Sequence, residues 1–428
     1  MSRTNSRLRA FLSVVAILSS VRLNAQDPIP PRLTLEEAVR LAVVRNPSLA
    51  ADKNEIEALE GDSIAASQRL NPAVTVETEN YPIRANPGPF LSNQELTLRL
   101  DYEIERGGRR ELRAAEANQA VEAQKWAHKD QVRRMELEVK RAFCSMVLAK
   151  SNLEASRSIL EQAERTIELN RVRLAQGDIS ALELNRIEVE KLRFQDDVFQ
   201  AELALGNSKS ALLALLNAPD LSQDLDVVGA LPVTDQLSEA GMPPRAAVDE
   251  LFRAALQKRP DIAFALQERG RADTETRLQR AMRSPNVTVG GGYKRDGVDN
   301  SFVLGVTLPL TIFNRNQGGV IRADAERRRT ANLETVLKKR VQLEVQQAYN
   351  AVEINRKRVE YIRTQHLKKA EDASKVTLAS YNFGAATLID YLDAQRTYRD
   401  ALRIYNQALF DERVSLYELA SAIGSGVE

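Results

Sequence analysis

The sequence contains very little cysteine and histidine. Among its 428 residues there is one cysteine, Cys144, and there are two histidines, His128 and His366. A single cysteine excludes an internal disulfide framework and a cysteine-cluster zinc site. The two histidines lie far apart in helix-like segments, so we interpret both as helix-surface residues. The sequence also has no Walker-type P-loop and no nucleophile–histidine arrangement, and it predicts neither an enzyme nor a cofactor.

Aromatic residues are scarce too, and charge of neither sign dominates. Aromatics make up 5% and charged residues 28% of the chain, with 60 Lys and Arg against 59 Asp and Glu. This profile favours long, charge-laced helices over a compact mixed fold. Because nucleic acids bind through basic surfaces, a nearly neutral chain argues against a nucleic-acid partner.

The N-terminus has the pattern of a secretory signal over residues 1–25. A basic segment, "MSRTNSRLRA", precedes the apolar "AFLSVVAILSSV", and "LNA" before Gln26 resembles a small-residue cleavage site. No cysteine follows that would carry a lipid anchor. Cleavage would change the net charge from +1 to −3, because it removes four arginines and no acid. No later stretch has the length and apolarity of a membrane helix. We therefore expect an exported protein.

The second half of the chain is a divergent copy of the first. Three pairs of segments match in the same order: "VVRNPSL" with "LQKRPDI", "RLNPAVTV" with "MRSPNVTV", and "GDISALELNRIEVE" with "GAATLIDYLDAQRT". Such a long period indicates a duplicated subdomain rather than a solenoid. We place the two repeats at 26–217 and 246–424, with a turn-rich linker at 218–245 and a short tail at 425–428.

Each repeat is expected to contain the same elements. Two helices are followed by two strands, a very long helix, a glycine turn and a helix of roughly 40 residues. The strands are predicted at about 73–81, 95–105, 286–294 and 301–310, and the glycine turns near 177 and 384. At 1.5 Å per residue the helix at 109–175 would be roughly 100 Å long, and its antiparallel partner about 60 Å. From Tyr391 to Ile423, steps of four and three residues predict lateral coiled-coil packing.

The predicted strands alternate between apolar and polar residues. In "LTLRLDYEIE" the leucines, Tyr102 and Ile104 share one face, while Arg99, Asp101, Glu103 and Glu105 share the other. This alternation is typical both of an ordinary half-buried sheet and of transmembrane barrel strands. Four strands are too few to close a barrel, and lipid tolerates no open sheet edge. If the strands cross a membrane, three chains must pool them into a twelve-stranded barrel.

The turn "YNFGAATLIDYLDAQ" at 381–395 carries two aspartates. Asp390 and Asp393 lie three residues apart, on one face of a helix near its N-terminus, where the helix dipole favours negative charge. One interpretation is helix stabilisation, and the other is a ring of acids around the axis of a trimer. Without a nucleophile or histidine they do not form a catalytic pair. In the first repeat their equivalents are Glu183 and Arg186.

These features together resemble the TolC-like outer-membrane factors, the outer membrane efflux protein family. The resemblance spans the chain after residue 25. It rests on "LTLEEAVRLAVVRNPSL", the duplicated helix–strand–hairpin unit, the "LPL" of the fourth strand and "YNFGAATLIDYLDA". The segment "DYEIERGGRRELRAAEA" is most similar to the CzcC-like heavy-metal efflux branch.

The resemblance implies a mainly helical homotrimer with a small β part. Its twelve-stranded barrel would lie in the outer-membrane lipid of a Gram-negative bacterium and continue into a periplasmic tunnel of helices. A periplasmic adaptor (membrane fusion) protein and an inner-membrane pump of the RND type would dock below. Substrate would pass through passively and chemically unchanged.

The resemblance also assigns roles to individual residues. At the periplasmic entrance it implies Asp390, Asp393, Tyr381 and Glu183, and at the adaptor-docking hairpin tips Gly177, Asp178 and Gly384. The barrel lumen would be lined by Glu77, Glu79, Arg99, Asp101, Glu103 and Glu105. Some relatives have a latch-forming arginine where this chain has Ala386, so a latch of that kind is not expected.

Three alternatives remain open from the sequence. A periplasmic adaptor or structural coiled-coil protein would also contain helical hairpins, but adaptors normally combine one hairpin with many strands. An exported enzyme with a helical scaffold would need an active site that the sequence does not suggest. The duct of a type I secretion system differs from an efflux duct only in its partners. The substrate, a metal cation or an organic compound, is not specified.

Overall fold

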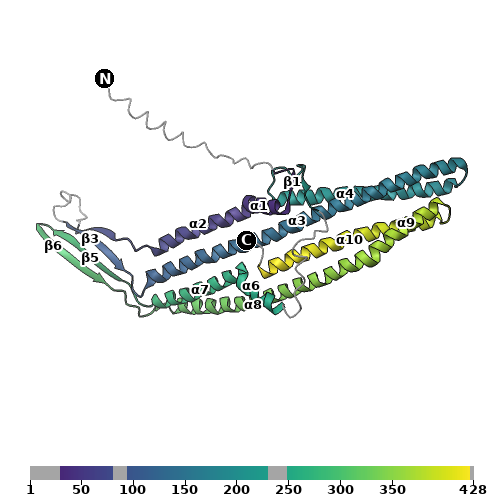
Figure 1. Ribbon diagram of the computed structural model, residues 1–428. Helices are drawn as coiled ribbons and strands as arrows, with labels where there is room; N and C mark the ends of the chain where they lie inside the picture. The colour runs from purple at the N-terminus through teal and green to yellow at the C-terminus, as the bar shows by residue number, and fades with distance from the viewer. Residues whose placement is uncertain (1–28, 81–93, 230–247, 425–428) are drawn as a thin grey trace, which may run out of the picture.

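The chain forms an elongated body with a sheet at one end and two helical hairpin tips at the other (Figure 1). The computed structural model describes residues 29–80, 94–229 and 248–424. The predicted signal at 1–25, part of the linker and the tail at 425–428 lie outside these residues. Among the described helices, none combines the length and the apolarity needed to cross a membrane.

Both halves contain the same elements in the same order. In the first half these are α1 (Leu35–Arg45), α2 (Pro47–Ser67), β2 (Ala73–Glu79), β3 (Glu95–Ile104), α3 (Arg109–Gln176) and α4 (Ala181–Leu215). In the second half they are α6 (Val248–Lys258), α7 (Pro260–Ala281), β5 (Val287–Asp296), β6 (Asp299–Thr307), α8 (Gln317–Tyr361), α9 (Lys368–Asn382) and α10 (Leu388–Ile423). Two short strands, β1 (Arg32–Leu33) and β4 (Asp226–Val227), pair in parallel beside α1.

Two predicted elements differ in detail from those observed. The very long helix expected in the second repeat contains a π-helical turn, η3 (Ile362–Leu367), between α8 and α9. Strand β6 ends at Thr307 rather than near Leu310. Pro309 accounts for this earlier end, because proline has no N–H to donate to a strand ladder.

The long helices form two rows that lie side by side. In Figure 1, α2 and α4 follow each other along α3, and α7 and α10 follow each other along α8 and α9. The same neighbours pack together: α3 with α2, α4, α7 and α10, and α8 with α7 and α10. The two shorter helices of each half therefore complete the length of the long one, as the predicted helix lengths require.

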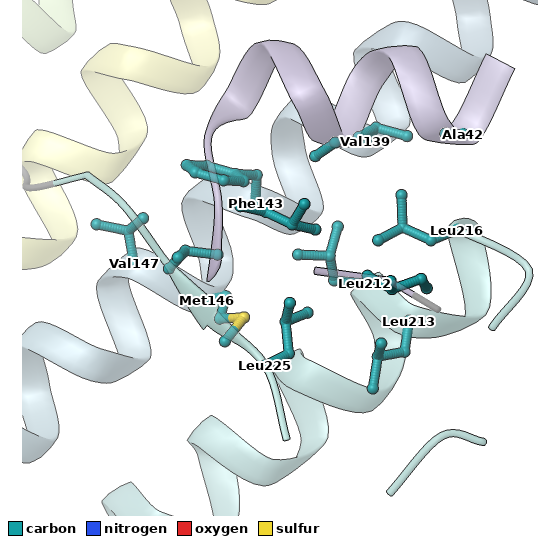
Figure 2. Close-up of a cluster of buried hydrophobic side chains, with 13 residues drawn as sticks. Ala42, Val139, Phe143, Met146, Val147, Leu212, Leu213, Leu216 and Leu225 are labelled. Carbon is teal, nitrogen blue, oxygen red and sulfur yellow. The ribbon is translucent and has the colours of Figure 1, made fainter. Parts of the chain in front are cut away.

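The apolar core is concentrated where the shorter helices meet. In the first half α1 fills the junction between α2 and α4, and Ala42, Val139, Met146, Leu212 and Leu216 are almost fully buried there (Figure 2). In the second half α6 occupies the same place, over a cluster from α6, α7, α8 and α10: Ala255, Ile262, Val341, Val345, Tyr349, Val352, Leu419 and Ala422. Each repeat therefore has its own core at mid-length.

The four-stranded sheet joins the two repeats. Its strands are antiparallel in the order β2-β3-β5-β6, so β2 and β6 form its two edges. The register places most apolar residues of the four strands on one face, among them Val76, Leu100, Tyr293 and Leu304. On that face Leu100 is 53% and Leu304 76% exposed. The apolar face of the isolated chain is therefore open.

Candidate functional site at the hairpin tips

Both hairpin tips are built in the same way. Gly177 (φ +82°) follows the end of α3, and Gly384 (φ +73°) follows the end of α9. Both adopt the left-handed conformation that is accessible to glycine at low cost. Asp178 follows Gly177, and its N–H donates to the carbonyl of Arg173 at 2.9 Å. The residues predicted to form the tips thus lie at the exposed end of each hairpin.

A capping box then starts the second helix of each hairpin, α4 or α10. The N–H of Ser180 donates to Glu183 at 2.9 Å, and the N–H of Thr387 donates to Asp390 at 3.0 Å. Each hydroxyl accepts a hydrogen bond from the N–H of that same acid. Hydrogen bonds from the side chain and N–H of Thr387 lower the pKa of Asp390. Both carboxylates therefore satisfy backbone donors at a helix start, as the helix-stabilisation interpretation predicts.

Asp393 differs from Asp390. It lies one turn further along α10 and is exposed, outside the capping box. Its charge acts on Arg396, whose pKa is raised first by a hydrogen bond to Glu190 and further by the charge of Asp393. Of the two aspartates, Asp393 is thus the one whose carboxylate takes no part in helix capping.

Tyr381 lies between the two hairpins rather than at the open tip. It is 5% exposed, and its hydroxyl donates to Asn170 of α3 at 2.7 Å. Its ring stacks on Tyr391 with centroids 5.5 Å apart, and the Tyr391 hydroxyl shares a 3.1 Å hydrogen bond with Thr166 of α3. Burial raises the pKa of both tyrosines.

Ion pairs continue this contact along α4 and α10. Arg396 makes two hydrogen bonds to Glu190, of 2.8 and 2.5 Å, and Arg399 bonds Asp197 at 3.0 Å. The Glu190 side chain is 4% exposed, and hydrogen bonding to Arg396 lowers its pKa. We call the set Thr166, Asn170, Glu190, Asp197, Tyr381, Tyr391, Arg396 and Arg399 the inter-hairpin seam. It holds the two tips of one chain together.

Most of the seam was not predicted from the sequence. One signal was available: Glu190 follows Ile187 by three residues and precedes Phe194 by four, so it occupies an apolar position of α4. A carboxylate at such a position requires a buried partner. The partner, Arg396, lies 206 residues away in the chain and could not be identified by spacing.

Five of the six predicted lumen residues lie on one face of the sheet. Glu77, Glu79, Arg99, Asp101 and Glu103 share the polar face by register. Glu77 and Glu79 are exposed, and Glu103 accepts a hydrogen bond from Asn286 at 2.7 Å. Glu105 instead follows the end of β3 and pairs with Arg113 of α3 at 2.6 Å. It therefore lies at the strand–helix junction.

No cluster of three or more His, Cys, Asp or Glu that could hold a metal ion occurs in the described parts of the chain.

Comparison with known proteins then decides the family. Residues 38–218 and 251–425 match the family model described as outer membrane efflux protein. The chain belongs to this family. The predicted family, its efflux function and its outer-membrane location are confirmed.

The similarity of this outer membrane efflux protein to relatives extends over more than two thirds of the chain. It is 27% identical to the cobalt-zinc-cadmium resistance protein CzcC of Cupriavidus metallidurans over 403 residues, covering 91% of this chain and 90% of that protein. It is 26% identical to the nickel and cobalt resistance protein CnrC of the same organism, covering 69% of this chain and 66% of that protein.

Solved structures share the fold. The outer membrane protein VceC of Vibrio cholerae superimposes with a TM-score of 0.75 at 18% identity, covering 92% of this chain and 97% of that chain. The CmeC outer membrane channel of Campylobacter jejuni gives 0.76 at 16% identity, covering 92% and 86%. The duplicated hairpin-and-sheet fold of this efflux protein is therefore that of known outer-membrane channels.

Proposed function

We propose that three copies of this chain form the outer-membrane exit duct of a tripartite efflux system and conduct substrate passively. The observation that carries the proposal is the sheet. It has two open edges and one exposed apolar face, which lipid tolerates only in a closed barrel. Three chains would supply twelve strands, an even number within the range of such barrels. The strands of neighbouring chains would pair through β2 and β6.

The helices support the trimer as well. On α4 a second apolar line, at Leu182, Val189, Leu192, Phe199 and Leu203, advances in heptad-like steps and is exposed in the single chain. On α8 and α9 exposed apolar residues recur at Val336, Leu343, Ile354, Tyr361 and Val376. Neighbouring chains in a ring of helices would cover both lines. At 1.5 Å per residue the ring would extend roughly 100 Å from the membrane.

The partners follow from the position of the tips. Gly177, Asp178 and Gly384 would face a periplasmic adaptor, together with Phe383, which is 88% exposed and offers an apolar contact. An inner-membrane pump of the RND type would supply the energy. The names of the relatives CzcC and CnrC support heavy-metal cations as substrates.

The proposed duct can be tested by extraction and conductance. We expect heat-modifiable trimers in the outer-membrane fraction and discrete conductance steps when purified trimers are added to a planar bilayer. Deleting the gene should raise sensitivity to cobalt, zinc or cadmium. A soluble periplasmic monomer without conductance would contradict the duct, and unchanged metal sensitivity with raised drug sensitivity would contradict the substrate class alone.

At the entrance, Asp393 is expected to act as the ring acid while Asp390 caps its helix. Asp393→Asn should raise the concentration of cobalt needed for half block by about tenfold, since loss of about 1.4 kcal/mol of cation binding has that effect. Asp390→Asn is the matched control, because an amide oxygen can still accept the bonds from Thr387. Trimers of both variants should assemble. Equal block in wild type and Asp393→Asn would refute the ring.

A further inference from the structure

We propose that Gly290 and Gly292 form a flat site on β5 against which the Arg99–Asp101 ion pair of β3 lies. Within the described strands, the polar face of the sheet would then present exposed acids to the conduction path, while Arg99 stays paired. The inference rests on the proposed duct and concerns its ion selectivity. It identifies two glycines and one ion pair as residues that determine that selectivity. We call Gly290 and Gly292 the glycine shelf.

The strand register brings these residues together. Asp101 lies opposite Gly290 and Arg99 lies opposite Gly292 on the polar face of the sheet. A Cβ atom added at Gly290 would overlap the carboxylate oxygen of Asp101. A Cβ atom at Gly292 would overlap the carbonyl of Leu98 and crowd the backbone of Arg99. Gly290 thus makes room for a side chain, and Gly292 allows the close approach of two strands.

Two donors hold the carboxylate of Asp101. Arg99 donates from Nε to it at 2.9 Å, and the hydroxyl of Thr75 on β2 donates at 3.3 Å. The Asp101 side chain is 14% exposed and that of Arg99 37%. The pair therefore lies along the wall of the sheet, with the positive charge of Arg99 neutralised in place.

The other charges on the polar face of the sheet also favour cations over anions. Within the described strands, the polar face carries two basic residues, and both are paired: Arg99 with Asp101, and Lys294 with Glu95. The same face also carries acids outside these two pairs, at Glu77, Glu79, Glu103, Asp296 and Asp299. A lumen lined in this way would attract cations and exclude anions. Release of the guanidinium from the wall would oppose that preference.

Gly290→Ala is the direct test, because its methyl group should displace the end of the Asp101 side chain and free Arg99. Gly305→Ala is the matched control, since it adds the same atom on the same face of β6 and that atom meets nothing within 4 Å. Reversal potentials in a potassium chloride gradient give the cation-to-anion permeability ratio. We expect Gly290→Ala to lower this ratio by at least about twofold, and Gly305→Ala to leave it unchanged.

Two further variants keep the backbone intact. Asp101→Asn should lower the ratio in the same way, while Arg99→Gln should not lower it. If Gly290→Ala fails to assemble, these two variants decide the question. Ratios for Gly290→Ala and Asp101→Asn equal to that of Gly305→Ala would overturn the role of the shelf. Wild-type protein without any conductance would instead reject the proposed duct.

Discussion

Replacing Arg396 by methionine should loosen the two hairpin tips from each other. The change removes both hydrogen bonds to Glu190, whose carboxylate then stays buried without its main partner. Breaking a buried ion pair costs about 3–5 kcal/mol, and we expect about 2–3 kcal/mol here because the Arg396 side chain is 40% exposed. Hydrogen exchange of the amides in residues 181–190 should then become about thirtyfold faster or more.

Two comparisons make this expectation specific. Arg403→Met is the matched control, because Arg403 is an exposed arginine on the same helix and its loss should leave exchange unchanged. Adding Glu190→Gln to Arg396→Met should restore much of the protection, since it removes the buried charge itself. If Arg396→Met exchanges like wild type, the seam does not hold the tips together.

The effect should also depend on pH in a defined direction. Arg396 lowers the pKa of Glu190 in the folded chain, so the stabilisation is present above the unfolded pKa of this carboxyl. It is lost as the pH falls through the lowered folded value. The exchange rates of wild type and Arg396→Met should therefore differ most at neutral pH and converge under strongly acidic conditions.

Within the proposed duct, the same variant should increase single-channel conductance, because the seam keeps the second hairpin against the first.

Replacing Arg259 by methionine should destabilise the middle of the second repeat. This arginine is 3% exposed and joins three elements: it bonds Asp261 at 2.6 Å, Glu344 of α8 at 2.8 Å and the carbonyl of Ala422 in α10 at 3.1 Å. Burial acts to raise the pKa of Asp261, but the bonds and charge of Arg259 outweigh it and the pKa is lowered. Loss of Arg259 leaves the largely buried carboxylate of Asp261 without its main partner, at a cost of about 3–5 kcal/mol.

Arg340 provides the control for that prediction. It also bonds Glu344, at 2.9 Å, but its side chain is 70% exposed. Arg340→Gln should therefore cost no more than about 0.5 kcal/mol. Thermal unfolding of the two purified variants, followed by circular dichroism, compares them directly. Equal melting temperatures would show that burial of Arg259 contributes nothing to stability.

Much of the fold followed from local pattern. Two-residue alternation in β3 fixed which side chains share a face, and Gly177 and Gly384 marked the turns because few other residues accept a positive φ. The heptad line from Tyr391 likewise predicted a packed face of α10. What it did not show is that α10 contacts both α8 and α3, and that small residues at Ala401, Ala408, Ser415 and Ala422 are buried as well.

The contacts that pair distant side chains could not be predicted. The seam depends on which turn of α3 or α4 meets which turn of α10, and residue spacing within one helix carries no such information. Asp101 and Gly290 similarly meet only because β3 pairs with β5 of the other repeat. The strand through the three consecutive glycines of β5 was predicted, but not that Gly290 makes room for the Asp101 side chain and Gly292 for the backbone of β3.

The paired capping boxes have an evolutionary consequence. When a gene segment is duplicated, each copy is free to change wherever its own folding does not depend on a residue. Both copies have kept the capping box, Ser180 with Glu183 and Thr387 with Asp390, because each helix needs partners for the free N–H groups at its N-terminus. One turn further on, the copies have become opposite in charge, with Arg186 in one and Asp393 in the other. In a threefold assembly the charge at this one position would then alternate in sign around the six tips, so a partner that meets all six at this position would need two kinds of contact site.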